Sequence, residues 1–227
     1  MISLVTACAG GIDPALPLPA HPPGVTSIYF RDEPLPPDVA ATWSKSLPIQ
    51  ASADPRLAAK RIKCRLPFLP EVSRAERLVW ADSCMEFSDL GFLLDWADLS
   101  VGERAVLVPH PDRKTVAEEY EYVLGQLRAR SRYLTSRYAI EPLERERDHF
   151  ARSHDLSKLP LWAGGVWMFP QSYRSRLFFD SWWEVVQQFS IFDQCAISPL
   201  LVEHGIEVVS ADVHLYRNAH FTRRPHP

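Results

Sequence analysis

The sequence lacks several features that would assign it to a specialised class of protein. It has 4 cysteines in 227 residues, at positions 8, 64, 84 and 195, and none of them forms a C-x-x-C pair. Neither a zinc ribbon nor a disulfide framework is indicated, and we expect free thiols in a reducing compartment. No long apolar run exists, and no basic region precedes the short apolar stretch at the N-terminus. We therefore expect no membrane span and no signal peptide, and a soluble, cytoplasmic protein.

A large net charge of one sign is also absent. The 25 Lys and Arg residues face 28 Asp and Glu residues, which gives a formal net charge of −3 at pH 7. This balance argues against a protein whose whole surface binds nucleic acid, although local basic patches remain possible. Glycine is scarce, with 9 residues against 20 prolines, and prolines cluster at 14–23 and 34–37. Such clusters are typical of irregular, extended connections between elements.

Short apolar runs alternate with amphipathic stretches along the chain. Asp54 and Pro55 have the residue types of a helix N-cap and a first helical position, and Thr115 and Glu118 have the spacing of a capping box. The predicted strands are 2–7, 25–30, 78–81, 106–108 and 206–209, and the predicted helices are 56–66, 115–127 and 174–189. This alternation predicts an α/β fold with a mostly parallel sheet, and we expect one domain over residues 1–227.

Polar residues and glycines follow most of the predicted strands. They occupy the segments 6–13, 31–32, 82–86 and 110–113. In open α/β sheets, ligands bind beyond the carboxyl ends of the strands, at the point where the strand order switches. The four segments therefore favour an enzyme whose site lies at this edge of the sheet.

The turn after one buried strand, Trp80-Ala-Asp82-Ser-Cys84, resembles the metal-binding turn of GT-A glycosyltransferases. Those enzymes use an Asp-x-Asp motif to hold a divalent cation on the diphosphate of a nucleotide sugar, because the departing diphosphate develops negative charge. Cys84 stands where the second aspartate would be. A thiolate is a soft ligand that matches Mg²⁺ poorly and is acceptable to Mn²⁺ at best.

Further motifs resemble, in the same order, a glycosyltransferase-like family first recorded as a domain of unknown function. They are Thr6-Ala7-x-x-Gly-x-x-Asp13, Tyr29-Phe-Arg-Asp32, Asp54-Pro-x-x-x-x-Lys60-x-x-Lys63 and His110-Pro-Asp-Arg113-x-x-x-x-Glu118-Glu119. A last block, from Trp162-Ala-Gly-Gly165 to Asp193-Gln194, resembles one shared with family 8 glycosyltransferases. The resemblance covers about residues 2–200. It implies a GT-A-like, Rossmann-like domain with a donor-binding half at about 1–110 and an acceptor half at about 111–227.

The resemblance also implies an activity. A sugar would pass from a nucleotide diphosphate sugar, with a UDP-sugar favoured, to a hydroxyl acceptor, assisted by Mn²⁺ or Mg²⁺. The implied residues are Asp193 and Gln194 beside the reacting sugar, Asp82 and His220 at the cation, and Thr6, Ala7, Asp32, Lys60, Lys63, His110, Arg113 and Gly165 on the donor. His214 is the alternative to His220.

Plainer structural interpretations stand beside these roles. Lys60 and Lys63 also fit the solvated face of a helix, and Asp193 also fits an N-cap. The two glycines at 164–165 also fit a strand bulge, and His110 with Arg113 also fits a polar loop. Of the tryptophans, Trp162 and Trp167 flank the glycines and are expected to line the site, whereas Trp182 lies on an apolar helical stripe and is expected in the core.

The acceptor stays open between a sugar, a protein and DNA. Residues 126–140 carry no acidic residue, and they hold Arg128, Arg130, Arg132, Arg137, Tyr133 and Tyr138. The tail, residues 216–227, adds Arg217, Arg223 and Arg224 with Phe221. Such segments can contact single-stranded or distorted nucleic acid, and more often they are ordinary solvated surface. Two alternatives therefore remain: a DNA-base glycosyltransferase acting on hydroxymethylated pyrimidines, and an inert domain that binds a nucleotide or a partner.

Overall fold

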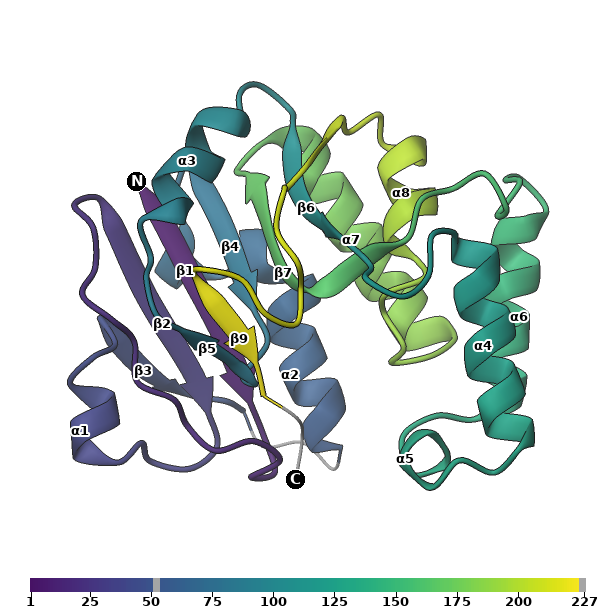
Figure 1. Ribbon diagram of the computed structural model, residues 1–227, viewed down its shortest axis with the longest axis horizontal. Helices are drawn as coiled ribbons and strands as arrows, with labels where there is room; N and C mark the ends of the chain where they lie inside the picture. Colours follow the sequence, from purple (N-terminus) through teal and green to yellow (C-terminus); the bar gives the residue numbers. More distant parts are fainter. Residues whose placement is uncertain (51–53, 225–227) are drawn as a thin grey trace.

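A seven-stranded sheet forms the centre of the protein. Its strands are β1 (Ile2–Cys8), β2 (Val25–Arg31), β3 (Lys45–Pro48), β4 (Arg77–Ala81), β6 (Ala105–Pro109), β7 (Trp162–Pro170) and β8 (Val208–Ser210). The computed structural model describes residues 1–50 and 54–224. The strand order is β3-β2-β1-β4-β7-β6-β8, with β7 antiparallel to β4 and β6 and the other pairs parallel. The predicted mostly parallel α/β sheet is therefore confirmed (Figure 1).

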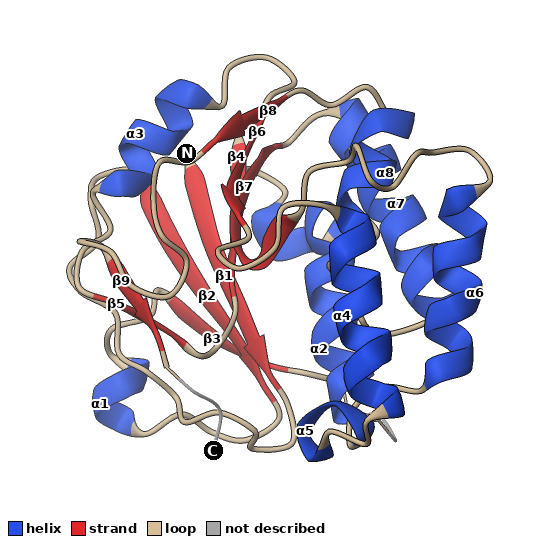
Figure 2. Cartoon of the chain, turned by 45° about the vertical axis from the view of Figure 1, so that its right-hand side comes forward, coloured by secondary structure: helices blue, strands red, loops and turns tan. Residues whose placement is uncertain are grey.

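Helices and a small ribbon cover the two faces of this sheet (Figure 2). The helices are α1 (Pro37–Ala40), α2 (Pro55–Cys64), α3 (Phe92–Leu99), α4 (Val116–Arg128), α5 (Arg132–Thr135), α6 (Ile140–Ala151), α7 (Tyr173–Gln188) and α8 (Ile197–Glu203). Helices α2, α7 and α8 share one core layer with α4 and α6, whereas α1, α3 and the ribbon of β5 (Met85–Phe87) and β9 (Phe221–Arg223) share the other. No helix among the described residues has the length and apolarity needed to cross a bilayer.

The central strands are apolar throughout because both of their faces are buried. Every residue of β1 is buried, with Leu4 and Cys8 in one core layer and Val5 and Ala7 in the other. A strand covered on both faces has a continuous apolar sequence. The hydrophobic periodicity therefore does not show which of its side chains face which core layer. Trp167 belongs to this interior and is fully buried, so the expectation that it lines the site is wrong.

The local helix signals of the sequence are confirmed. The carboxylate of Asp54 accepts hydrogen bonds from the backbone N–H groups of Arg56 and Leu57. Thr115 and Glu118 form the reciprocal capping box that opens α4. The predicted end of the first of these helices differs: α2 ends at Cys64 and the chain continues as a 3₁₀ turn at Leu66–Phe68. The second residue of that turn is proline, which has no N–H to extend the α-helical ladder.

Candidate functional site

A cavity of about 460 Å³ opens beside the carboxyl ends of β1 and β4. The register of these strands pairs Val5 with Trp80, so the segment after Ala81 lies next to Ala7. Further walls come from α2, the start and end of α4, α5, the glycine segment of β7 and the loop before α8. The volume is within the range of small-molecule sites, and the position is the one expected for a ligand in an open α/β sheet.

A buried aspartate held by two lysines forms the floor of the cavity. Lys60 Nζ lies 2.7 Å from Asp193 Oδ1, and Lys63 Nζ lies 2.9 Å from Asp193 Oδ2. The ammonium group of Lys63 also lies 5.6 Å from the ring centroids of both Trp80 and Trp182. Only 2% of the Lys63 side chain is exposed. The interpretation of Lys63 as a solvent-facing residue is therefore wrong, because the ion pair and the two rings hold its charge inside the fold.

The charges of this floor reinforce one another. Burial by itself raises the pKa of Asp193, but the ammonium groups of Lys60 and Lys63 outweigh it and hold the pKa at about 2. Burial likewise lowers the pKa of Lys60, yet Asp193 and then Asp82 raise it above its ordinary value. Asp193 is therefore an ion-paired carboxylate at neutral pH. It is not an N-cap, since α8 begins three residues beyond the Asp193-Gln194 pair and its N-cap is Ala196.

Asp82 follows β4 and is the more accessible carboxylate of the cavity. Its Oδ1 accepts a hydrogen bond of 2.7 Å from Trp80 Nε1 and lies 3.6 Å from Lys63 Nζ. Its backbone N–H donates to the Gly165 carbonyl at 2.7 Å. The Asp82 side chain is 39% exposed, whereas that of Asp193 is 7% exposed. Asp82 is thus fixed on one side and open to a ligand on the other.

The two glycines of β7 allow the backbone to approach these charged groups. A Cβ on Gly164 would lie 3.3 Å from Lys63 Nζ, and one on Gly165 would lie 3.5 Å from Asp82 Oδ2. The pairing of β6 with β7 also shifts its register across this segment. The strand irregularity and the close approach of the backbone therefore occur together at these glycines. The sequence alone does not distinguish between the two interpretations.

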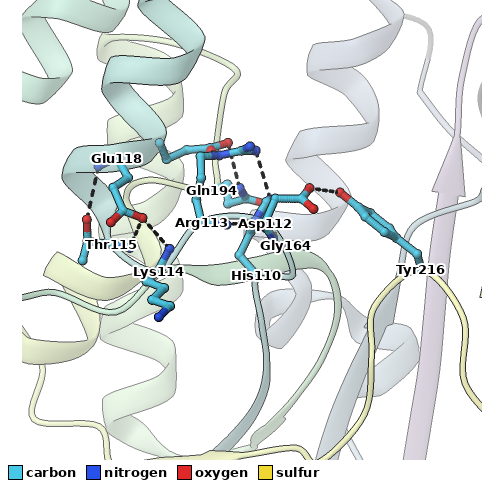
Figure 3. Close-up of polar contacts among 10 residues, drawn as sticks. His110, Asp112, Arg113, Lys114, Thr115, Glu118, Gly164, Gln194 and Tyr216 are labelled. Carbon is cyan, nitrogen blue, oxygen red and sulfur yellow. Dashed lines mark hydrogen bonds and ion pairs between the residues drawn. The ribbon is translucent and has the colours of Figure 1, made fainter.

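Gln194 joins the floor to the start of α4 through a chain of hydrogen bonds (Figure 3). The Gly164 N–H donates to Gln194 Oε1 at 3.2 Å, and Gln194 Nε2 donates to Glu119 Oε1 at 3.1 Å. The other oxygen of Glu119 is ion-paired with Arg113 Nε. Burial raises the pKa of Glu119 above its ordinary value, against the opposing effect of Arg113. This chain fixes the side-chain amide of Gln194 in one orientation.

His110 presents a neutral imidazole at the same wall. Its Nδ1 accepts hydrogen bonds from the backbone N–H groups of Asp112 and Arg113, both at 3.2 Å. Burial, and then the Arg113 guanidinium, lower the pKa of His110 to about 4. Asp112 in turn accepts a hydrogen bond of 2.5 Å from the hydroxyl of Tyr216, a contact visible in Figure 3.

The structure gathers most, but not all, of the site residues expected from the sequence. Nine line the cavity: Ala7, Lys60, Lys63, Asp82, His110, Arg113, Gly165, Asp193 and Gln194. Thr6 is buried within β1, and Asp32 lies beyond β2, where it accepts a hydrogen bond of 2.6 Å from the Gly10 N–H. His220 Nδ1 lies 3.0 Å from Asp89 Oδ2, and its ring stacks on Phe92. These three residues do not line the cavity.

The residues around Asp82 do not fit a divalent-cation site. Across residues 1–50 and 54–224, no group of three His, Cys, Asp or Glu side chains is placed to hold a metal ion. Cys84 is 3% exposed, and burial followed by the Asp82 charge raises the pKa of its thiol to about 12. His220 and Asp82 are not brought together. The expected Mn²⁺ or Mg²⁺ stays a prediction.

Several residues of the cavity were missed as site residues. Arg223 enters from β9, Arg56 from α2 and Arg137 from the loop after α5. Glu119 ends the motif that begins at His110, and the resemblance implied no role for it. Arg223 and Arg137 lay in segments noted for their basic and aromatic composition, and that composition was the one signal that pointed to them. Their convergence depends on the packing of β9 and α5, which local patterns do not reveal.

Comparison with known proteins supports the fold. No protein-family model matches the chain, and no curated protein matches it in sequence. A crystal structure of mouse xyloside xylosyltransferase 1 is similar to this chain, with a TM-score of 0.50 and 11% sequence identity. The similarity covers 92% of this chain and 84% of that one. The chain therefore has a GT-A-like glycosyltransferase fold. Membership of the glycosyltransferase-like family, and a link to family 8, stay predictions.

Proposed function

We propose that the protein transfers a sugar from a nucleotide diphosphate sugar, with a UDP-sugar as the favoured donor, to a hydroxyl acceptor. One observation carries the proposal: in a GT-A-like fold, the cavity at the carboxyl ends of β1 and β4 combines an accessible carboxylate with a preformed set of cations. A sugar needs hydroxyl-binding carboxylates and amides, and a diphosphate needs positive charge. The cavity offers both in one place.

The proposed donor site extends along the cavity from β1 to β7. The nucleoside lies against Ala7 and the residues that follow it, and Thr6 and Asp32 support that wall from behind. Asp82 accepts a hydrogen bond from a hydroxyl of the donor. Lys60, which is 24% exposed, contributes positive charge near the diphosphate. The backbone of Gly165 contacts the sugar without a side chain between them.

The proposed transfer step makes one bond and breaks one. The acceptor oxygen bonds to the anomeric carbon, and the bond from that carbon to the diphosphate oxygen breaks, leaving its electron pair on the diphosphate. The acceptor's proton passes to the departing diphosphate. Asp193, with a pKa of about 2, is too weak a base to take that proton. We therefore assign Asp193 and Gln194 the orientation of the transferred sugar, and not proton abstraction.

Donor hydrolysis tests this proposal without knowledge of the acceptor. The purified chain is incubated with a panel of UDP- and GDP-sugars, once with Mn²⁺ and once with EDTA, and release of the nucleoside diphosphate is measured. We expect slow hydrolysis of at least one UDP-sugar. Asp82→Asn should reduce it by at least about 10-fold, because a charged hydrogen-bond acceptor to the donor is lost.

Asp98→Asn is the matched control, since Asp98 is an exposed carboxylate on α3 and does not line the cavity. It should leave hydrolysis unchanged. Binding of a nucleotide sugar without any turnover would favour the inert binding domain instead. If the chain binds none of the nucleotides and nucleotide sugars tested, with or without Mn²⁺, the proposal is refuted.

A further inference from the structure

The turn after β4 has no second carboxylate at the position where an Asp-x-Asp motif would supply one. Cys84 occupies that position, and its side chain belongs to the core layer that also contains Met85 and Phe87. It is 3% exposed. The turn therefore offers a ligand one carboxylate, Asp82, which already faces the ammonium group of Lys63 at 3.6 Å.

An arginine lies against this turn. Strand β9 pairs with β5 so that Arg223 is opposite Met85, and the next backbone N–H along the chain donates to the Cys84 carbonyl at 2.8 Å. The Arg223 side chain lines the cavity, and its guanidinium carbon lies 5.6 Å from the ring centroid of Tyr216. Burial lowers the pKa of Arg223, but the adjacent Cys84 sulfur and the Asp82 carboxylate raise it above its ordinary value.

Among the described residues, the contacts of Arg223 are with an aromatic ring and a thiol, and none of its ion-pair partners is a carboxylate. Within the part of the chain that the structure describes, no carboxylate lies within 4.0 Å of its guanidinium. The neighbouring charges are paired: Lys60 and Lys63 with Asp193 and Asp82, and Arg113 with Glu119.

A divalent cation at Asp82 would stand beside two positive groups, Lys63 and Arg223, and no group of three His, Cys, Asp or Glu side chains among the described residues is placed to hold it. A guanidinium, in contrast, needs no protein ligands. It presents a planar set of N–H donors that matches two phosphate oxygens at once. The local charge is therefore better suited to a bare diphosphate than to a diphosphate that carries a metal ion.

We propose that Arg223 binds the diphosphate of the donor directly and supplies the positive charge that a divalent cation supplies in Asp-x-Asp enzymes. The site so defined takes nucleoside diphosphates and pyrophosphate without a metal. This inference rests on the proposed function, since it names how that donor is held.

Binding of UDP and of inorganic pyrophosphate, measured by calorimetry in EDTA and again in MnCl₂, tests the inference. For the wild-type chain we expect binding in EDTA, with a Kd that changes by less than about 3-fold in MnCl₂. Arg223→Gln should weaken both ligands by about 10- to 100-fold in EDTA, because hydrogen bonds to a charged group are lost. Arg224→Gln is the matched control: its guanidinium contacts Glu86, it does not line the cavity, and its removal should leave both Kd values unchanged.

A second variant keeps the test independent of any damage to the fold. Arg223→Lys retains a charge and loses the planar donor pair, so it should bind more tightly than Arg223→Gln and more weakly than the wild type. Two results would overturn the inference while leaving the proposed function intact: UDP binding that needs Mn²⁺, or UDP binding in EDTA that Arg223→Gln does not weaken. Absence of UDP binding in both buffers would instead overturn the proposed function, and the inference with it.

Discussion

Two groups of cations face the same cavity, and they differ in what balances their charge. The lysines of α2 are paired inside the fold: Lys63 is 2% exposed and, with Lys60, holds the carboxylate of Asp193. The arginines at the rim, Arg223 and Arg137, have no carboxylate within ion-pair distance among residues 1–50 and 54–224. They rest instead over the rings of Tyr216 and Tyr133.

The difference separates charge that builds the site from charge that is free to bind a ligand. A buried ion pair is costly to break, and because its carboxylate offsets part of the lysine charge, Lys60 attracts an incoming anion less strongly than an unpaired cation would. An arginine on an aromatic ring keeps its donors and its field available. We therefore expect substitutions at the floor to change stability first, and substitutions at the rim to change ligand affinity first.

The largest effect is expected from Asp193→Ala. The change leaves the buried ammonium group of Lys63 with only the more distant Asp82 as a counter-charge, and loss of one partner of a buried pair costs about 3 to 5 kcal/mol. The free energy of unfolding, measured in urea, should fall by about this amount.

Asp180→Ala is the control for Asp193→Ala. Asp180 is 54% exposed and pairs with Arg65 at the surface, so its loss should change the free energy of unfolding by less than about 1 kcal/mol. Equal effects of the two variants would contradict the conclusion that Asp193 balances buried charge in the floor of the cavity.

The pH dependence of the free energy of unfolding should report the ion pairing of Asp193 in the floor of the cavity. The pKa of Asp193 is about 2 in the folded protein, below its ordinary value of 3.8, so folding favours the ionised form. The resulting stability, about 2 kcal/mol, is fully present above pH 4 and is lost as the pH falls through 2. Urea unfolding of the wild type and of Asp193→Asn from pH 5 to pH 2 should show their stability difference shrinking toward the acid end. A constant difference would contradict the low pKa.

The sequence predicted which strand ends border the cavity better than it predicted which charged residues meet inside it. Residues at the end of β1 and directly after β4 were expected at the cavity because parallel strands end at one edge, and Ala7 and Asp82 lie there. Lys63 was assigned to the wrong face, since helical periodicity treats a lysine as solvated and cannot foresee a buried counter-charge 130 residues later. Arg223 could not be placed at all, because β9 reaches the cavity through pairing with β5 that no local pattern encodes.

Replacing Gly164 or Gly125 with alanine should change the stability by a smaller amount, and in opposite directions, because the two glycines have different surroundings. A Cβ on Gly164 would lie 3.3 Å from Lys63 Nζ, so Gly164→Ala forces the ion-paired lysine to move and should cost about 1 to 3 kcal/mol. Gly125 lies in α4 with no atom within 4 Å of a built Cβ among the described residues. Gly125→Ala should therefore stabilise the protein by about 0.5 to 1 kcal/mol. Thermal unfolding of both variants checks the opposite signs, and equal shifts would show that the floor tolerates a displaced Lys63.

The smallest effect concerns arginines outside both groups. Arg128 pairs with Glu144, and Arg130 and Arg132 are exposed and do not line the cavity. If DNA is the acceptor, its affinity should fall steeply between low and moderate salt, because phosphate contacts release counterions, and replacing these three arginines with glutamine should flatten that dependence. We expect neither result: DNA binding measured at two salt concentrations should be weak, and the triple variant should match the wild type. The net charge of −3 gives no general attraction to DNA. A steep salt dependence that the triple change abolishes would therefore mean that the solvated arginines between the end of α4 and the start of α5, and not the rim of the cavity, select the acceptor.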